Sequence, residues 1–413
     1  MTRISAWAWV LCAGLICSGW AQIQRPSPLG SGPSNLHNRA ISNLSTVTTG
    51  NMSFSPIAGI ERQNSVSYLG HYPGGSWAEP RDINNQGLVV GFGDIATGFT
   101  RPLSVQSSGM LAGHWSDLGT LGGDRSDGEV MSMGVAANGM VVGHSAIQGD
   151  YYVHAFVWTS MSGMTDLSTL TNLGHNFSLA SGVNKSGTLI VGWSSREFNG
   201  SDSLPVVWTA CADCSTPHWN IQQLDITGFE QVTYWWAWTV NNRGQIIGTA
   251  SNPDGSPIAV VWNRRPDDAG WKITQLPALA DFPNIGVNDI NDKGEIVGYA
   301  AAADWSMWFP AIWKPTMPGG SSFTLTRLVS LTGFDVGWGA ASGINDRGDI
   351  VGNSYDDQFN QYATYWRDND PSSIQLLGFP GTWSVAQKVN DDRMAVGAYG
   401  SDTVAEDIAI VKF

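Results

Sequence analysis

Short apolar segments separated by polar, glycine-containing segments recur along this chain from about residue 65 to its end. The clearest example is the phrase at 343–352, GINDRGDIVG, in which apolar residues flank a polar turn. Its core returns as DINNQGLVVG, GVNKSGTLIVG, TVNNRGQIIG and DINDKGEIVG. The copies end at the following glycines: Gly91, Gly143, Gly192, Gly248, Gly298, Gly352 and Gly397. Copies spaced by about 50 residues predict a repeat architecture.

Two further apolar segments accompany the phrase. One usually ends in Trp (154–158, 204–208, 258–262, 309–313 and 362–366), and the other surrounds a Leu (164–170, 221–226, 273–279, 325–331 and 374–379). The order along the chain is a Leu strand, an I/V-N strand, a V-G strand and a Trp strand. Four short strands per repeat are typical of a propeller blade. We therefore predict an all-β fold: a seven-bladed β-propeller of four-stranded antiparallel blades over residues 61–413, with one such unit per blade and the first and last blades adjacent.

The repeated phrase fits the hairpin between the I/V-N and V-G strands. Asn345 suits the first position of a type I turn, Gly348 suits the left-handed position after it, and Gly352 allows close backbone approach. Two copies deviate, with Ala136 at the Asn position and Arg393 at the turn-glycine position. We expect a strained or differently shaped turn at Arg393. We predict positive φ at the glycines of the other six turns: Gly87, Gly139, Gly187, Gly244, Gly294 and Gly348.

The N-terminal segment has the features of a secretory signal peptide. Arg3 precedes a short apolar run (4–17), and the small residues Gly19 and Ala21 precede Gln22. We predict a signal peptide over 1–21 and a flexible Pro/Ser/Asn-rich leader over 22–60. A lipid anchor on Cys17 is disfavoured by the bulky residue before it. The protein is expected to be secreted, with the extracellular space, the bacterial periplasm or the cell surface as its location.

Cysteine use and charge narrow the possible partners. Cleavage leaves Cys211 and Cys214, a single C-x-x-C with His218 nearby, whereas structural zinc needs four ligands. We predict a loop disulfide between the two cysteines, as is usual in exported proteins. The formal charge of −14 disfavours nucleic acid and anionic membranes. We expect a monomer with no membrane span after signal cleavage.

Three features together resemble the HAF repeat: the segment HAFVW at 154–158, the segment LGTLGG at 118–123, and the I-N-x-x-G-x-x-V-G phrase. The repeat is named for its His-Ala-Phe triplet and occurs in bacterial proteins regarded as extracellular. Only one unit here carries the full triplet; four others keep the Trp and lose the His. The resemblance implies export and a repeat fold, and it brings no reaction and no catalytic residues.

Catalytic motifs are absent from the sequence. It contains no G-x-S-x-G elbow, no H-E-x-x-H, no Walker loop and no EF-hand loop. Its 7 His are scattered without the spacing of metal-ligand pairs. Acidic residues follow each V-G strand, where they suit turns or a calcium-binding rim, and we favour turns because their offsets vary. We predict no catalytic residue, no metal and no cofactor.

Candidate binding residues lie on one predicted face. There we place the loops from Leu strand to I/V-N strand and from V-G strand to Trp strand; the opposite face receives the tight turns and the inter-blade links, including the cysteines. Seven positions before the turn Asn stand Trp77, Glu129, Phe177, Tyr234, Asn284, Trp338 and Trp383. The aromatic members either form stacking platforms or pack between blades. Trp305 and Trp308 are expected to be exposed, which predicts a partner.

Three functions compete on these observations. The first is an exported, non-catalytic repeat protein that binds a glycan or protein through the long-loop face. The second is an extracellular polysaccharide hydrolase or lyase, which would need paired carboxylates in a central pocket. The third is a purely structural protein of surface assemblies. We favour the first.

Overall fold

The computed structural model describes residues 65–413 apart from 124–129, 150, 199, 212–217, 267–269, 335–336, 368–369 and 402–405. The predicted signal peptide (1–21), the predicted leader (22–60) and Cys214 lie outside the described residues. Among the residues that are described, no helix is long and apolar enough to cross a membrane.

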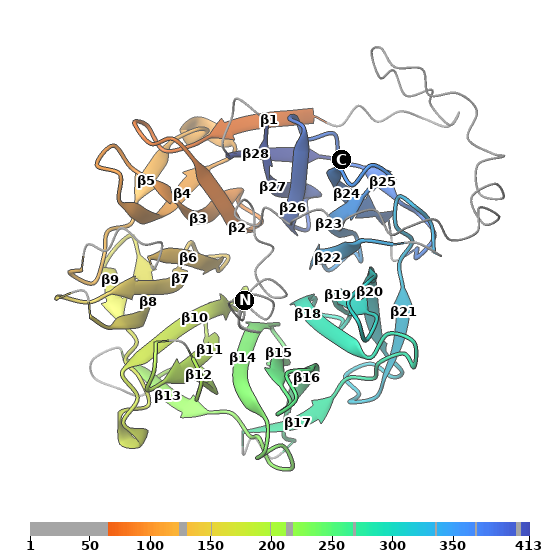
Figure 1. Cartoon of the computed structure of the whole chain (residues 1–413). Helices are drawn as coiled ribbons and strands as arrows, with labels where there is room; N and C mark the ends of the chain where they lie inside the picture. The colour runs from red at the N-terminus through yellow and green to blue at the C-terminus, as the bar shows by residue number, and fades with distance from the viewer. Residues whose placement is uncertain are drawn as a thin grey trace, which may run out of the picture. The chain divides into compact units, whose positions relative to one another are not determined.

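In the described residues, seven four-stranded antiparallel sheets stand around a common centre as the blades of a β-propeller (Figure 1). Blade 1 comprises β2 (Ala78–Ile83), β3 (Leu88–Asp94), β4 (Thr100–Gln106) and β5 (Trp115–Asp117). Blade 2 comprises β6 (Met131–Val135), β7 (Val141–Ala146), β8 (Val153–Thr159) and β9 (Gly163–Asp166). Blade 3 comprises β10 (Phe177–Val183), β11 (Leu189–Ser195), β12 (Leu204–Ala210) and β13 (Trp219–Gln223). Blade 4 comprises β14 (Thr233–Val240), β15 (Ile246–Ser251), β16 (Pro257–Arg264) and β17 (Trp271–Gln275).

Blade 5 comprises β18 (Asn284–Ile290), β19 (Ile296–Ala301), β20 (Trp308–Pro315) and β21 (Phe323–Arg327). Blade 6 comprises β22 (Gly339–Ile344), β23 (Ile350–Tyr355), β24 (Gln361–Trp366) and β25 (Gln375–Leu376). Blade 7 comprises β26 (Trp383–Val389), β27 (Met394–Gly400), β28 (Asp407–Lys412) and β1 (Ser65–Gly70). The short 3₁₀ helices η1 (Gly109–Leu111) and η2 (Thr171–Leu173) lie in connections. The predicted seven-bladed all-β fold is confirmed.

The ring closes by sharing a blade between the two ends of the propeller. The outermost strand β1 pairs antiparallel with β28, with Ser65 opposite Lys412 and Val66 opposite Val411. Each blade therefore begins with its I/V-N strand and ends with the Leu strand that follows it. The predicted order, with the Leu strand first in each blade, was wrong by one strand. The hydrogen bonds between β1 and β28 thus hold the two ends of the propeller together.

The two faces carry the connections predicted for them, with one correction. The tight N-x-x-G turns and the hairpins between third and fourth strands share one face, which we call the turn face. The hairpins between second and third strands and the links from one blade to the next share the other, which we call the loop face. We had placed the inter-blade links on the turn face. The segment that contains the cysteines instead joins β12 to β13 within blade 3; Cys211 is disulfide-bonded.

The turn phrase adopts the predicted geometry. All six glycines have positive φ, from 69° at Gly187 to 99° at Gly348. Arg393, which occupies the same position in blade 7, also has a positive φ of 60°. In blade 6 the Asn345 side-chain oxygen accepts from the amides of Arg347, Gly348 and Asp349. The asparagine side chain thus supplies a hydrogen-bond acceptor for the backbone amides of the turn.

The same asparagines also join each blade to the next, a role that the sequence did not reveal. Asn345 Nδ2 donates to the carbonyl oxygen of Asn390 in blade 7, and Asn390 Nδ2 donates to that of Asn84 in blade 1, each at 3.0 Å. Asn84, Asn241 and Asn291 bond their next blades in the same way. Between blades 2 and 3 the Ala137 amide donates to the Lys185 carbonyl, and between blades 3 and 4 the Ser186 amide donates to Asn242. The repeated phrase therefore closes a ring of hydrogen bonds.

The glycine that ends each phrase is required by backbone contact within the blade. A Cβ on Gly352 would lie 2.0 Å from the carbonyl oxygen of Ala340 on the inner strand. The six other phrase-ending glycines would meet an inner-strand carbonyl oxygen at 1.8–2.2 Å. Since real contacts of this kind do not occur, any side chain here would push the two strands apart.

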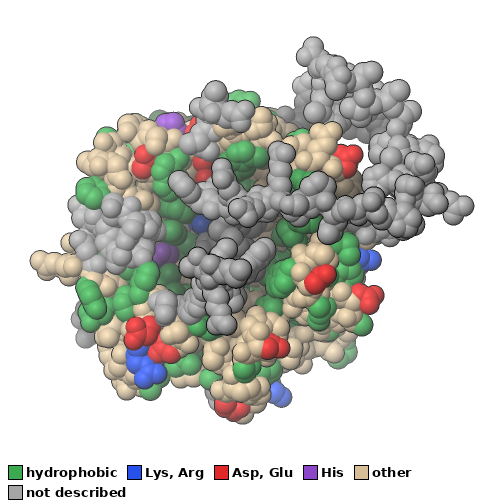
Figure 2. All heavy atoms as spheres, viewed as in Figure 1, with side chains coloured by type: hydrophobic (Ala, Val, Ile, Leu, Met, Phe, Trp, Pro, Cys, Tyr) green, Lys and Arg blue, Asp and Glu red, His purple; other side chains and the backbone are tan. Residues whose placement is uncertain are grey.

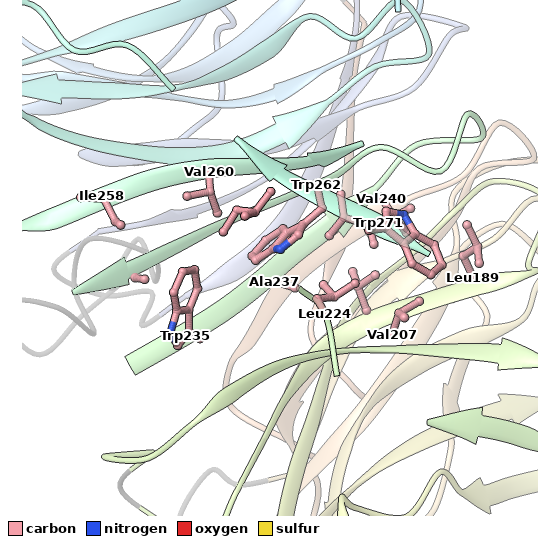
Figure 3. Packing of buried hydrophobic residues seen from close by; sticks show 14 of the residues in the cluster. Leu189, Val207, Leu224, Trp235, Ala237, Val240, Ile258, Val260, Trp262 and Trp271 are labelled. Atoms are coloured by element: carbon pink, nitrogen blue, oxygen red, sulfur yellow. The ribbon is translucent and has the colours of Figure 1, made fainter. Parts of the chain in front are cut away.

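Tryptophans of the third strands hold the blades together. Trp208, Trp262, Trp313 and Trp366 are fully buried. Their indole nitrogens donate to carbonyl oxygens of the link that enters from the previous blade: Leu167, Asp225, Pro277 and Val329, at 2.7–2.9 Å. Figure 3 shows Trp262 and Trp235 of blade 4 in one apolar cluster with Leu189 and Val207 of blade 3. These four tryptophans are therefore packing residues.

Candidate functional site

In the six blades where the structure describes it, the repeated aromatic position lies at or beside the start of the innermost strand, on the loop face. Two of its side chains are buried, Phe177 at 6% exposed and Asn284 at 5%. Four are half-buried: Trp77, Tyr234, Trp338 and Trp383. Glu129 lies outside the described residues. The position therefore forms a partly accessible belt around the inner rim. Figure 2 shows acidic side chains mostly toward the outer part of the face that it displays.

An aromatic cluster covers the loop face of blades 5 and 6, and consists of Trp305, Trp308, Trp338, Tyr355 and Phe359. The ring centroids of Trp308 and Trp338 lie 4.5 Å apart, and those of Trp338 and Phe359 lie 5.2 Å apart. Tyr355 approaches Trp308 edge-on at 6.5 Å. Phe359 is 63% exposed. One inner-rim ring, Trp338, and four rings from the two hairpins and the strand ends that flank them thus form one apolar surface.

The two tryptophans of the blade 5 hairpin are less exposed than we expected. Trp305 and Trp308 are both half-buried. Trp305 lies 6.3 Å from the buried ring of Tyr299, and both tryptophans pack against Tyr299, Ala301 and Ala340. The expectation of free rings was wrong because cluster packing covers one side of each. The other side remains accessible to a partner.

The hairpins of this cluster hold aromatic residues in a backbone conformation that favours glycine. The loop-face hairpins of blades 1, 3 and 4 close on Gly98, Gly200 and Gly255, whose φ values are 79°, 68° and 85°. In blades 5 and 6 the equivalent residues are Trp305, with φ 59°, and Phe359, with φ 63°. A side chain in this region costs about 1–2 kcal/mol. Strain of this size at two neighbouring positions is typical of functional sites.

A second aromatic group occupies the loop face of blades 2 and 3. Tyr151, 73% exposed, meets Tyr152 edge-on at 4.8 Å; Tyr152 meets Phe177 at 5.3 Å, and Phe177 meets Phe198 at 5.5 Å. Sequence reasoning singled out Phe177 alone, because the other three stand in hairpins of unequal length. Their aromatic content was the available signal.

The acidic residues of the loop-face hairpins serve their own turns. Asp304 Oδ1 accepts from the amide and hydroxyl of Ser306, and Asp254 Oδ1 accepts from those of Ser256. These hydrogen bonds hold the pKa of both carboxyls below its usual value. Among the described residues, no three His, Cys, Asp or Glu side chains gather closely enough to hold a metal ion.

Charged side chains meet at the propeller axis. Asp82, Asp289 and Lys388 line a cavity of about 100 Å³, in which Lys388 Nζ lies 2.6 Å from Asp289 Oδ1. Asp82 accepts from the Val135 amide of the next blade, and Asp289 accepts from that of Ile344. Burial raises the pKa of Asp82 to about 6. The carboxylates therefore tie neighbouring blades together.

The fold places this chain among the β-propellers. No family model matches it, and neither does any curated protein. It is similar to the β-propeller domain of the Trilobed protease from Pyrococcus furiosus (TM-score 0.50, 10% identity, 81% of this chain and 94% of that one), whose structure is described as having an open velcro topology. It is also similar to a structure from a study of two prolyl endopeptidases (TM-score 0.50, 12% identity, 81% of this chain and 46% of that one).

A more distant likeness exists to Trypanosoma rangeli sialidase, with a TM-score of 0.44 and 10% identity; it covers 86% of this chain and 60% of that one. This chain thus spans less than two thirds of the sialidase's length. At such identities the comparisons show the propeller fold alone.

Proposed function

We propose that this chain is an exported, non-catalytic β-propeller that binds an extracellular glycan through the aromatic cluster on its loop face. The observation that carries the proposal is the pair of strained aromatics, Trp305 and Phe359, at hairpin positions where three other blades have glycine. A stable scaffold alone would favour glycine there. Selection for an accessible aromatic ring at each position accounts for the strain.

A glycan fits the chemistry of this surface better than other ligands. Sugar rings present flat C–H faces and a rim of hydroxyl groups. The cluster offers half-buried flat rings, and the adjoining turn supplies the Asp304 carboxylate and the Ser306 hydroxyl. Rigid aromatics with polar neighbours also dominate protein-binding hot spots, so a protein ligand is the second candidate.

The hydrolase alternative needs paired carboxylates around a substrate. Asp82 and Asp289 line one axial cavity, but its volume of about 100 Å³ is smaller than a cavity of about 150 Å³ that holds benzene. A sugar ring does not fit between them. Both carboxylates also bond backbone amides of the next blade. These observations favour binding over hydrolysis.

Export, monomeric state and membership of the HAF-repeat family belong to the same proposal. The apolar N-terminal segment with its small residues before Gln22 supports export, to the extracellular space, periplasm or cell surface. The HAFVW segment and the recurring turn phrase support the family.

A glycan-array screen of the secreted protein tests the proposal. For the glycan that binds, Trp305→Ala and Trp308→Ala are expected to weaken affinity about tenfold each, which corresponds to about 1.4 kcal/mol. The melting temperature should change little, and Tyr68→Ala, at a 65% exposed ring on the outermost strand β1, should bind like the wild type. A screen in which no glycan binds, or variants that unfold, would contradict the proposal.

A further inference from the structure

A groove of about 330 Å³ lies on the loop face between blades 3 and 4, apart from the aromatic cluster. The hairpin between β11 and β12 forms one side, and the link from β13 to β14 forms the other. Its volume falls within the range of small-molecule sites, which begins at about 300 Å³. The side chains that matter for its chemistry are His175, Arg196, Asp202, Glu230 and Tyr234.

His175 presents a hydrogen-bond acceptor to this groove. The Ser194 hydroxyl donates to the Phe177 carbonyl (2.9 Å) and accepts from the Leu170 amide (3.1 Å). His175 Nδ1, 3.1 Å from that hydroxyl, must therefore carry the proton and donate it. Burial lowers the pKa of His175, so the ring is neutral at pH 7 and Nε2 holds a lone pair. The side chain is only 3% exposed, and Nε2 has no protein partner in the described part of the chain.

Arg196 presents hydrogen-bond donors to the same groove. Its Nε lies 2.6 Å from Asp202 Oδ2, which fixes the guanidinium plane. Neither Nη atom makes a hydrogen bond to a described residue. With a neutral His175, the groove holds one cationic side chain and two anionic ones, Asp202 and Glu230. An anionic ligand is therefore disfavoured.

Tyr234 supplies an aromatic wall in a strained conformation. Its φ is 55°, and the register of β14 against β15 shifts between Thr233 and Trp236. A bulge of this kind turns a side chain away from its regular direction. The half-buried ring lines the groove, and the exposed side chain of Leu173 lies nearby. Here too, an aromatic residue on the loop face adopts a strained backbone conformation.

We infer that this groove is a second saccharide subsite, which takes one neutral sugar ring of the glycan. A sugar hydroxyl both donates and accepts, so neighbouring hydroxyls can donate to His175 Nε2 and accept from the Arg196 Nη groups. The C–H face of the ring packs on Tyr234. The class of ligand rests on the proposed function, whereas the groove itself is independent of the aromatic cluster. Two separated subsites on one rigid face suit an extended chain rather than a monosaccharide.

The test uses the mature full-length protein and a panel of neutral hexasaccharides built from glucose, mannose, xylose, galactose and N-acetylglucosamine, with binding measured by calorimetry. For the hexasaccharide that binds, Arg196→Ala and Tyr234→Gly are each expected to weaken affinity at least tenfold. Arg196 is 61% exposed, so its replacement should leave folding intact, and glycine suits the φ of Tyr234. Tyr68→Ala is the matched control, with unchanged affinity expected.

The possible outcomes separate the two proposals. If Arg196→Ala binds like the wild type while Trp305→Ala binds weakly, the groove is no subsite and the proposed function stands. If the groove variants lose binding and the tryptophan variants do not, the groove is a saccharide subsite, and the proposal that the aromatic cluster binds the glycan is overturned. If no hexasaccharide binds the wild type, both proposals are overturned.

Discussion

Exchanging Phe359 for glycine and for alanine separates the backbone strain at the loop face from the contribution of the ring. Phe359 has φ 63° and is 63% exposed; its ring contacts Trp338 edge-on at 5.2 Å. Removing a ring contact of this type costs about 0.5–1.5 kcal/mol. Glycine relieves about 1–2 kcal/mol of left-handed strain but adds about 0.4–1 kcal/mol of unfolded-state entropy.

These terms nearly cancel for Phe359→Gly, so its free energy of unfolding should stay within about 1 kcal/mol of the wild type. Phe359→Ala loses the ring and keeps the strain. It should therefore be less stable than the glycine variant by about 1 kcal/mol, although alanine is the better residue almost everywhere else. Urea unfolding followed by tryptophan fluorescence measures both, and equal slopes against urea show that the comparison is valid.

Gly255, which holds the equivalent position in blade 4, supplies the reverse control. Its φ is 85°, and a Cβ there would meet nothing within 4 Å. Gly255→Ala should therefore lower the free energy of unfolding by about 1 kcal/mol, the net of left-handed strain and unfolded-state entropy, without a change in glycan affinity. Both Phe359 variants should bind glycan equally weakly. A Phe359→Gly variant less stable than Phe359→Ala would refute the strain, and wild-type affinity in both would refute the role of the ring.

Three further predictions concern the scaffold. Gly294→Val should destabilise by about 2 kcal/mol or more, because φ is 83° and a Cβ would lie 2.9 Å from the Gln245 side chain; urea unfolding measures this. Asn345→Ala should lower the free energy of unfolding by at least about 2 kcal/mol, because the 2% exposed side chain makes five hydrogen bonds: three within its turn, one to the Asp349 carboxylate and one to blade 7. Asn138→Ala is the control; it loses one exposed hydrogen bond and should change the free energy of unfolding little. Burial, helped by the charge of Arg81, lowers the pKa of His144 to about 3, so the unfolded chain binds a proton below about pH 6.5 that the folded protein does not. Between pH 7 and pH 5, the free energy of unfolding of His144→Gln should therefore fall by about 2 kcal/mol less than that of the wild type. Equal falls in the two proteins would contradict a buried neutral ring.

The blade count followed from the sequence because the repeated phrase performs the same physical task in every blade. Left-handed turns need glycine at positions such as Gly348, and contact with the inner strand excludes every side chain at positions such as Gly352. Such requirements act residue by residue, and they are visible without a structure. The bonds from Asn345 and Asn390 to neighbouring blades were not visible, since the same side chain also satisfies its own turn.

Strand order alone does not show which strand begins a blade. The same series of strands divides into four-stranded units whether each unit begins with the Leu strand or with the I/V-N strand. Loop length held the missing signal. Only residues 160–162 separate the Trp strand β8 from the Leu strand β9, as in a tight hairpin, whereas 167–176 separate β9 from the next I/V-N strand β10. Hairpin partners are joined by short loops. The Leu strand therefore belongs to the blade before it.

Site residues were harder to predict because they depart from the repeat. Trp305 and Phe359 follow Gly298 and Gly352 at the same spacing that separates Gly255 from Gly248, so the sequence carries this alignment, but it does not show that the two rings adopt a positive φ. The position before the inner strand kept a constant offset, so its aromatics were found. Their burial, from 6% exposed at Phe177 to half-buried at Trp338, depends on neighbours that the repeat does not fix.

Departures from the repeat also differ in what offsets their strain. Arg393 replaces the turn glycine of blade 7 with φ 60°, and its Nε and Nη2 atoms bond both oxygens of the fully buried Asp349 at 2.9 and 3.1 Å. A bidentate pair of this kind offsets a strain of about 1–2 kcal/mol from within the protein. Phe359 has the same backbone strain, but among the described residues its mostly exposed ring makes one aromatic contact, the edge contact with Trp338. A bound ligand would supply the missing compensation, which is why the loop-face rings, and not the strained turn at Arg393, mark the binding surface.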